Sequence, residues 1–264
     1  MRVIRGRKAL VTGAAAGIGR AIALALAREG ADLFLIDIDG EKLEAVAAEA
    51  RRQGVSVVAD ICDLSEPAAI SAAVARLTAA WGGLEILINN AGLTYYGPTE
   101  AMSAAQWRRI IAVNLLAPIQ LFHELLQALA AAEEAHVLNV CSMFGVAPWR
   151  KAAAYQTSKY GLVGFTAALR AEFRREHFGV TALCPGFVQT ALLDGRAQDR
   201  AAPAWISTTP EIVARRAITA IRRNRGLVLV TPAAHFYWRL YRLAPGLVDW
   251  LLREGWRRRG RING

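Results

Sequence analysis

The amino-acid sequence predicts a doubly wound α/β fold, a seven-stranded parallel sheet with helices on both faces. Short apolar, β-rich runs alternate with alanine-rich stretches of helical length. The apolar runs are hydrophobic throughout, which indicates strands that are buried on both faces. Strands that alternate with helices in this way are joined by right-handed crossovers into a parallel sheet.

The elements are expected in regular order along the chain. Strands are predicted at 9–12, 32–36, 55–59, 84–88, 136–141, 180–184 and 227–230, and helices near 18–29, 40–52, 66–80, 103–131, 152–177 and 210–223. No repeat or linker divides this region, so we predict one domain over 1–234. Two segments depart from the alternation, the irregular stretch 191–209 and an aromatic, arginine-rich extension at 235–264.

The basic charge is confined to one part of the chain. The formal net charge is +10, yet residues 1–199 carry 19 basic and 19 acidic side chains, whereas residues 200–264 carry 13 arginines against three acidic residues. A uniformly basic surface is therefore excluded, and no nucleic-acid-binding module accompanies the charge. Nucleic acid is not an expected partner.

Cysteine, histidine and terminal patterns indicate the compartment. The three cysteines and four histidines lack the spacing of a disulfide framework or a metal site, so we expect reduced cysteines and no metal. The N-terminus shows no signal-peptide pattern, and no segment is a convincing membrane span. A cytoplasmic location is the default expectation.

A glycine cluster follows the first strand and opens directly into a helix. Gly13, Gly17, Ile18 and Gly19 occupy this turn. Glycines permit a tight turn and close backbone approach, and a helix N-terminus offers free N–H groups to a pyrophosphate. A purely structural turn would look similar, but the strand–turn–helix context favours a dinucleotide site.

Asp37 ends the second strand, 18 residues after Gly19. A carboxylate there can accept hydrogen bonds from both adenosine ribose hydroxyls and would repel a 2′-phosphate. Neither Ile38 nor Ala16 supplies a basic group. NAD is therefore favoured over NADP as the cofactor.

The spacing of these glycines resembles that of the short-chain dehydrogenase/reductase family, and further motifs follow in order. They are Asp63-Leu64, Asn89-Asn90-Ala91-Gly92, Asn114, Ser142, Tyr155 with Lys159, Pro185-Gly186 and Thr190. The resemblance covers residues 8–231 and implies a Rossmann fold and an oxidoreductase that interconverts an alcohol and a ketone by hydride transfer. It also implies a homodimer or homotetramer.

The resemblance implies roles around the cofactor. Asp63 would hold the adenine amino group beside the backbone of Leu64, with Asp60 as an alternative. Asn90 and Gly92 would line the adenosine ribose. Val188 and Thr190 would line the carboxamide side of the nicotinamide. Tyr155 and Lys159 would contact the nicotinamide ribose.

Tyr155 and Lys159 are four residues apart and leave one helix face together. A free phenol has a pKa of about 10, and a nearby ammonium group lowers it. We therefore expect Lys159 to lower the pKa of Tyr155, the general acid and base, while Ser142 hydrogen-bonds the reacting oxygen. Asn114 would hold a water that links Lys159 to solvent, or is an inert polar residue at a helix kink.

The loops beyond the strand ends predict the substrate. Tyr95, Phe144, Trp149 and Phe187 would give a large apolar and aromatic lining, with 191–209 as a mobile lid. This favours a bulky hydrophobic alcohol or ketone, lipid-like, steroid-like or aromatic. The alternatives are an NADPH-dependent ketone reductase, for example of 3-oxoacyl substrates, and a non-catalytic dinucleotide-binding protein.

The extension at 235–264 predicts two helical pieces separated by Pro245-Gly246. Its tryptophans and arginines would suit a membrane interface with anionic lipid. The alternatives are contact with a second subunit and a flap over the chain's own pocket.

Overall fold

The computed structural model describes residues 1–173, 177–189 and 207–260. Seven parallel strands form the sheet in the order β3-β2-β1-β4-β5-β6-β9, which confirms the predicted fold. They are β1 (Lys8–Thr12), β2 (Asp32–Asp37), β3 (Val57–Ile61), β4 (Ile86–Asn89), β5 (Ala135–Val140), β6 (Phe178–Cys184) and β9 (Leu227–Leu229). β3 begins two residues later than expected. The chain changes direction across the sheet between β1 and β4, where such folds bind ligands at the carboxyl ends of the strands.

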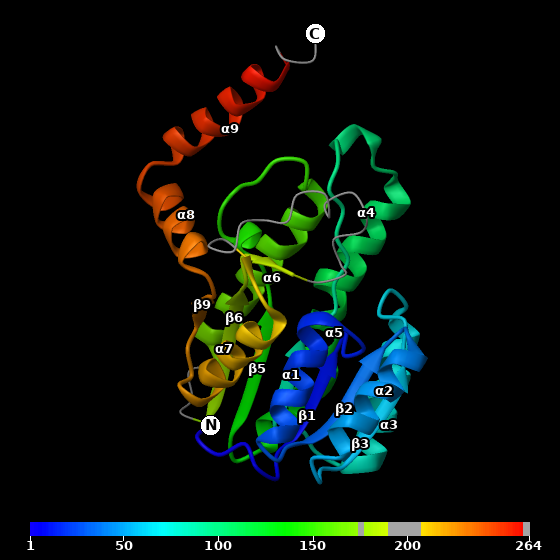
Figure 1. The fold of residues 1–264 in the computed structure, drawn as a ribbon. Coiled ribbons are helices and arrows are strands. Elements are labelled where there is room, and N and C mark those ends of the chain that lie inside the picture. The colour runs from blue at the N-terminus through cyan, green and yellow to red at the C-terminus, as the bar shows by residue number, and fades with distance from the viewer. Residues whose placement is uncertain (174–176, 190–206, 261–264) are drawn as a thin grey trace.

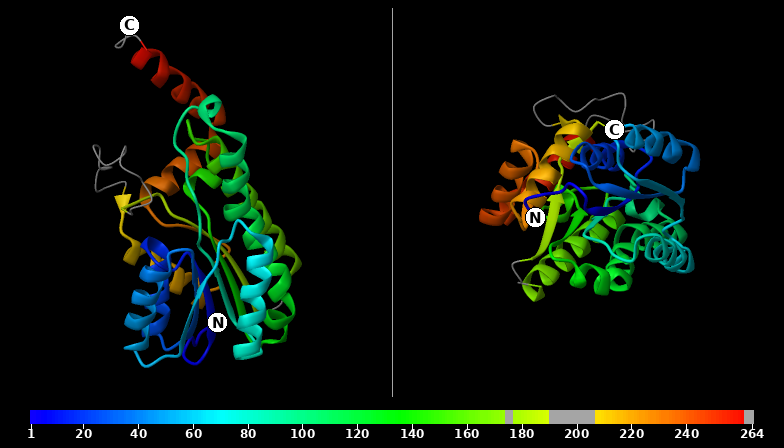
Figure 2. Two further views of the ribbon diagram at one scale, coloured as in Figure 1. Left: turned by 90° about the vertical axis from the view of Figure 1, so that its right-hand side faces the viewer. Right: turned by 90° about the horizontal axis from the view of Figure 1, so that it is seen from below.

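Helices cover both faces of the sheet (Figures 1 and 2). On one face lie α1 (Gly17–Arg28), α2 (Gly40–Arg51) and α7 (Pro210–Arg222), and on the other α3 (Pro67–Trp81), α5 (Ala117–Ala131) and α6 (Ala153–Glu172). Successive residues of β2 serve both layers, since Leu33 and Leu35 pack with the first and Phe34 and Ile36 with the second. This two-sided burial explains why the strands are apolar throughout.

The long helix expected over 103–131 is interrupted. It consists of α4 (Ala104–Ile111), a π-helical turn η2 (Ala112–Leu116) and α5. By length and composition, the run Ala104–Ala131 contains an 18-residue window apolar enough to cross a membrane, with a mean hydropathy of 1.3 in that window. The α5 part of this run buries Leu121, Leu125 and Leu129 in the core.

The remaining elements lie near the carboxyl ends of the strands. They are η1 (Thr99–Ala101), η3 (Met143–Gly145), and the short paired strands β7 (Phe187–Val188) and β8 (Ser207–Thr208). Of the predicted lid, residues 191–206 lie outside the described part of the chain. α6 ends at Glu172, five residues before the expected end of its helix.

The C-terminal extension forms two helices, α8 (Pro232–Leu243) and α9 (Pro245–Gly260). The break lies at Ala244, and Pro245 and Gly246, which were expected between the two helices, are the first residues of α9. α8 begins three residues earlier than expected, because the Thr231 side chain caps it by accepting a hydrogen bond from the Ala234 N–H. α9 projects beyond the body in two views (Figures 1 and 2).

Candidate active site

The glycine turn forms a tight cradle between β1 and α1. A Cβ atom on Gly13, whose φ is +64°, would lie 2.8 Å from the Ala91 Cα atom, and one on Gly19 would lie 2.0 Å from the Gly13 carbonyl oxygen. Only glycine fits either position. Ala16 precedes α1 and provides no side-chain cap. The first N–H groups of α1 are therefore available to an anionic ligand such as a pyrophosphate.

Asn90, which follows β4, is hydrogen-bonded to this turn. Its side-chain amide donates to the carbonyl oxygens of Thr12 (2.9 Å) and Gly13 (3.1 Å). The Thr12 hydroxyl in turn accepts from the N–H groups of Asn90 (3.0 Å) and Ala91 (3.1 Å). Sequence reasoning missed Thr12, although its place at the end of the first strand, just before Gly13, was a signal. Both residues shape the cradle from behind.

Asp37 lies against the glycine turn. Its carboxylate accepts hydrogen bonds from the N–H groups of Ala15 (2.9 Å) and Asp39 (3.1 Å). Lys42, a nearby cation, is held by Asp39, and the Ile38 side chain is exposed. The edge of the cradle beyond the end of β2 therefore presents a carboxylate beside an apolar side chain.

The two aspartates considered for the adenine end have different surroundings. The Arg76 guanidinium donates three hydrogen bonds of 2.9–3.0 Å to the Asp60 carboxylate. Asp63 accepts from the N–H and hydroxyl of Ser65, and these bonds, the N–H first, hold the pKa of Asp63 below its usual value. Leu64 is buried in the core. Asp60 is ion-paired with Arg76, and Asp63 with Arg109 at the longer distance of 3.9 Å. The assignment of the adenine amino group to Asp63 stays a prediction.

Tyr155, Ser142 and Lys159 meet at the carboxyl end of β5. The Lys159 ammonium lies 5.8 Å from the centroid of the Tyr155 ring. Burial raises the pKa of Tyr155 to about 12, against a hydrogen bond with Ser142 that lowers it. The buried Lys159 Nζ donates to the Val140 carbonyl oxygen at 2.8 Å, and burial lowers its pKa.

In this structure the pKa of Tyr155 is raised, and Lys159 does not lower it. The ammonium is turned toward the Val140 carbonyl, and desolvation of the phenol outweighs the opposing effects. A raised pKa favours the protonated phenol, which is the form that donates a proton to a carbonyl oxygen.

Asn114 lies in the π-helical turn and is fully buried. Its Oδ1 accepts from the Leu93 N–H (2.7 Å), and its Nδ2 donates to the Leu93 carbonyl (2.9 Å) and the Ser158 hydroxyl (3.0 Å). A Cβ on Gly92 would lie 3.4 Å from Asn114 Oδ1 and 3.5 Å from Lys159 Nζ. Asn114 and Lys159 therefore flank Gly92, and Asn114 fixes the loop that follows β4.

Aromatic side chains cluster beside Tyr155. Phe144 stacks on Trp149 with ring centroids 5.2 Å apart, and Phe187 meets both rings edge to face. Phe144 also meets Tyr155 at 6.5 Å. Three of the four predicted pocket residues are thus brought together. Tyr95 packs in a neighbouring cluster with Met102 and Ile110 and donates to the Pro98 carbonyl.

A fourth ring in this cluster comes from the C-terminal extension. Tyr237 on α8 meets Trp149 edge to face at 6.1 Å and donates a hydrogen bond to the Pro148 carbonyl. Sequence reasoning did not place Tyr237 at the site, since nothing in its local pattern indicates a contact almost ninety residues away. We name Phe144, Trp149, Phe187 and Tyr237 the aromatic wall.

Two residues assigned to the nicotinamide end differ in outcome. Val188 lies in β7 and packs against the core, whereas Thr190 lies outside the described residues.

Beneath the site, a buried polar chain that the sequence did not indicate links three elements. Asn89 donates to Asn139, and Asn139 donates to Thr166, both at 2.8 Å.

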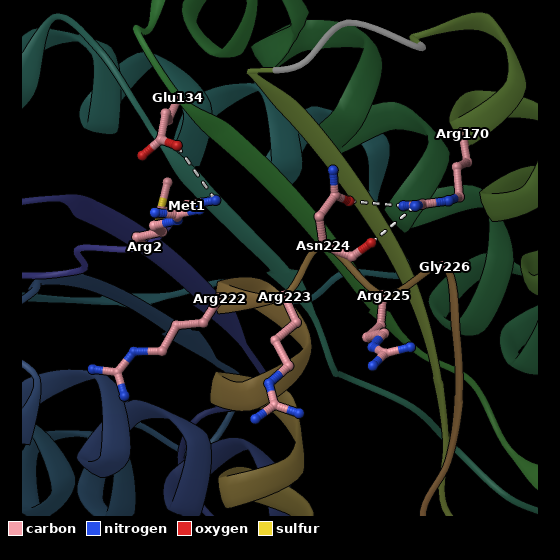
Figure 3. Close-up of a pocket in the computed structure, with 9 residues that line it drawn as sticks. All are labelled: Met1, Arg2, Glu134, Arg170, Arg222, Arg223, Asn224, Arg225 and Gly226. Carbon is pink, nitrogen blue, oxygen red and sulfur yellow. Dashed lines mark hydrogen bonds and ion pairs between the residues drawn. The ribbon is translucent and has the colours of Figure 1, made fainter.

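A cavity of about 900 Å³ lies away from these residues (Figure 3). Arg2, Arg170, Arg222, Arg223 and Arg225 contribute to its lining. None of the predicted catalytic residues lines it, and Arg170 is bound to Asn224 and Val180. Part of the basic excess of the last quarter therefore belongs to the end of α7 and not to the tail.

Comparisons with known proteins agree with this fold. The family model described as short chain dehydrogenase matches residues 7–201. A putative ketoacyl reductase of the granaticin polyketide synthase of Streptomyces violaceoruber is 38% identical over 199 residues, 75% of this chain and 73% of that protein.

Two solved structures share the fold over most of their length. A short-chain dehydrogenase/reductase from Burkholderia phymatum in complex with NAD has a TM-score of 0.83 and 27% identity, covering 94% of this chain and 96% of that one. A variant of actinorhodin polyketide ketoreductase with NADPH has a TM-score of 0.80 and 28% identity, covering 89% and 99%.

Proposed function

Because the chain belongs to the short-chain dehydrogenase/reductase family, we propose that this oxidoreductase interconverts a bulky hydrophobic secondary alcohol and its ketone with NAD. The observation that carries the substrate class is the aromatic wall next to Tyr155 and Ser142. Burying an apolar substrate against such a lining contributes about 25 cal/mol of binding free energy per Å² of apolar surface removed from water.

NAD is supported by Asp37. The glycine cradle and the uncapped start of α1 fit a dinucleotide. The bound nicotinamide would supply or accept the hydride. A carboxylate at the end of β2, with Lys42 already paired to Asp39, repels a 2′-phosphate. By the same fit, Asp63, Asn90 and Gly92 would hold the adenosine half, and Lys159, Val188 and Thr190 the nicotinamide half.

The chain's own residues would carry the proton. In ketone reduction, Tyr155 gives its hydroxyl proton to the carbonyl oxygen while Ser142 donates a hydrogen bond to the same oxygen. In alcohol oxidation, Tyr155 must first lose its proton, which burial disfavours. Movement of the Lys159 ammonium from the Val140 carbonyl toward Tyr155 would lower this cost.

A second candidate is an NADPH-dependent ketone reductase acting on 3-oxoacyl substrates. The similarity to polyketide ketoreductases favours it, and so does the protonated state of Tyr155, which suits reduction. The two candidates share their catalytic residues and differ in cofactor and substrate.

Initial rates with a panel of substrates distinguish the candidates. We expect bulky alicyclic or aromatic secondary alcohols to exceed short polar alcohols in kcat/KM by at least tenfold, with NAD as the better cofactor. A preference for short alcohols would contradict the substrate proposal. Efficient reduction of 3-oxoacyl thioesters with NADPH alone would establish the second candidate.

We also propose a cytoplasmic homodimer or homotetramer, as the family resemblance implies. Leu116 and Tyr160 are exposed apolar side chains on η2 and α6, where a second copy could cover them. Sedimentation equilibrium measures the number of subunits, and a monomer at micromolar concentration would contradict this proposal.

A further inference from the structure

An apolar stripe on α9 is exposed. The side chains of Leu247, Trp250 and Leu251 are 46%, 56% and 48% exposed. They are spaced i, i+3 and i+4 and therefore share one face of the helix. Leu243, at the end of α8, is 85% exposed at the same junction. Large apolar side chains gathered in this way on a soluble surface mark an interaction site.

The opposite face of α9 is fixed to the body. Val248 is 1% exposed, and the Arg150 guanidinium donates to the Leu252 carbonyl oxygen at 3.1 Å. These contacts hold the stripe outward, so it is not a face that α9 buries against its own chain.

Positive charge accompanies the stripe. Arg239, Arg242 and Arg253 are exposed on α8 and α9, and the sequence continues into Arg257, Arg258 and Arg259. Over residues 235–264 there are seven arginines against two acidic residues. An apolar face with tryptophan, bordered by arginines, is the composition of helices that lie in an anionic membrane interface.

α9 also has a suitable position. It extends beyond the end of the molecule at which α4 lies, clear of the sheet (Figures 1 and 2). α8, to which α9 is joined, contributes Tyr237 to the aromatic wall. A surface that contacts α9 would therefore come close to the end of the molecule that carries the aromatic wall.

We propose that α9 docks this protein on an anionic lipid surface, with Leu247, Trp250 and Leu251 in the interface and Arg239, Arg242 and Arg253 on the headgroups. This inference is independent of the reaction proposed above. A second copy of the chain fits less well, because a specific protein interface buries about 1,200–2,000 Å² and three side chains supply little of that area. Two copies would also bring their basic helices together, whereas anionic headgroups provide counter-charge.

Vesicle flotation of the full-length protein tests the proposal. Vesicles of phosphatidylcholine alone are compared with vesicles in which about a third of the lipid is phosphatidylglycerol, since a basic helix is drawn to anionic lipid. We expect the wild type to bind the anionic vesicles, with binding that weakens as salt is raised. Trp250→Ser/Leu251→Ser should lower the partition coefficient at least tenfold, and Arg253→Gln should lower it less and only on anionic vesicles.

Val3→Ser is the matched control, because Val3 is an equally exposed apolar residue far from α9, and it should bind as the wild type does. Unchanged NADH binding by the double variant shows that the fold and the cofactor site are intact. Absent binding by the wild type, or equal binding by the wild type and the double variant, would overturn the proposal. Loss of a dimer in the double variant, without any effect on vesicle binding, would assign the stripe to a second copy instead.

Discussion

At the scale of single residues, the proposed reaction depends on the Tyr155 hydroxyl. Tyr155→Phe removes the transferable proton but keeps the ring that Phe144 and Lys159 contact. We expect turnover to fall by about 10²–10⁴-fold, while the affinity for NADH, measured by fluorescence titration, changes less than threefold. Turnover within tenfold of the wild type would remove Tyr155 from its role.

Lys159 illustrates what the sequence could not predict about the site. The four-residue spacing correctly brings Lys159 near the Tyr155 ring, because helix geometry determines which side chains share a face. The pKa of Tyr155 depends instead on burial and on where the ammonium points, which are set by β5 and its Val140 carbonyl. Those contacts come from distant parts of the chain and have no local signal.

At the scale of elements, the turn between β1 and α1 has a strict steric requirement. Gly19→Ala would place a methyl group 2.0 Å from the Gly13 carbonyl oxygen, so the cradle must open. We expect at least a tenfold loss of NADH affinity in a fluorescence titration. Gly164→Ala, in α6, is the control, because a Cβ there meets nothing within 4 Å. Equal affinities for both variants would show that the turn does not hold the cofactor.

α8 should influence substrate choice through Tyr237. Tyr237→Ala removes the ring that supports Trp149, and we expect KM for bulky alcohols to rise about fivefold to tenfold, the effect of roughly 1 kcal/mol or more. KM for short alcohols should change little. Phe236→Ala, an exposed neighbour on the same helix, should leave both values unchanged. An equal effect of the two substitutions would contradict the assignment of Tyr237 to the aromatic wall.

Elements were predictable to different degrees. The strands were found because apolar runs buried on both faces stand out locally, and the break between α8 and α9 because proline ends a helix. The π-helical turn that contains Asn114 was not predicted, because its apolar residues continue the helical pattern of the segments on both sides. The contact of Tyr237 with Trp149 was missed for a similar reason, as it joins segments distant in sequence.

At the scale of the whole molecule, His136 links stability to pH. It is buried, its Nε2 hydrogen-bonds the Thr181 hydroxyl at 2.9 Å, and burial lowers its pKa from 6.5 to about 3. The unfolded chain therefore binds one more proton than the folded chain between these values. The stabilisation is complete above pH 6.5 and is lost as pH falls toward 3, by up to about 1.36 kcal/mol per pH unit.

Urea unfolding at several pH values measures this linkage. His136→Gln keeps a hydrogen-bonding side chain that does not titrate, so its free energy of unfolding should fall less steeply than that of the wild type between about pH 6.5 and pH 4.5. Parallel pH profiles for the two proteins would show that His136 is not the group responsible.

The central claim, an NAD-dependent oxidoreductase, rests on the charge of Asp37 beside the glycine cradle. The most direct measurement is the ratio of kcat/KM for NAD to that for NADP, in the wild type and in Asp37→Asn, with one bulky secondary alcohol. We expect a ratio of at least tenfold in favour of NAD in the wild type and a clear fall in the variant, because the amide no longer repels a 2′-phosphate. A wild-type ratio of one or below would contradict it.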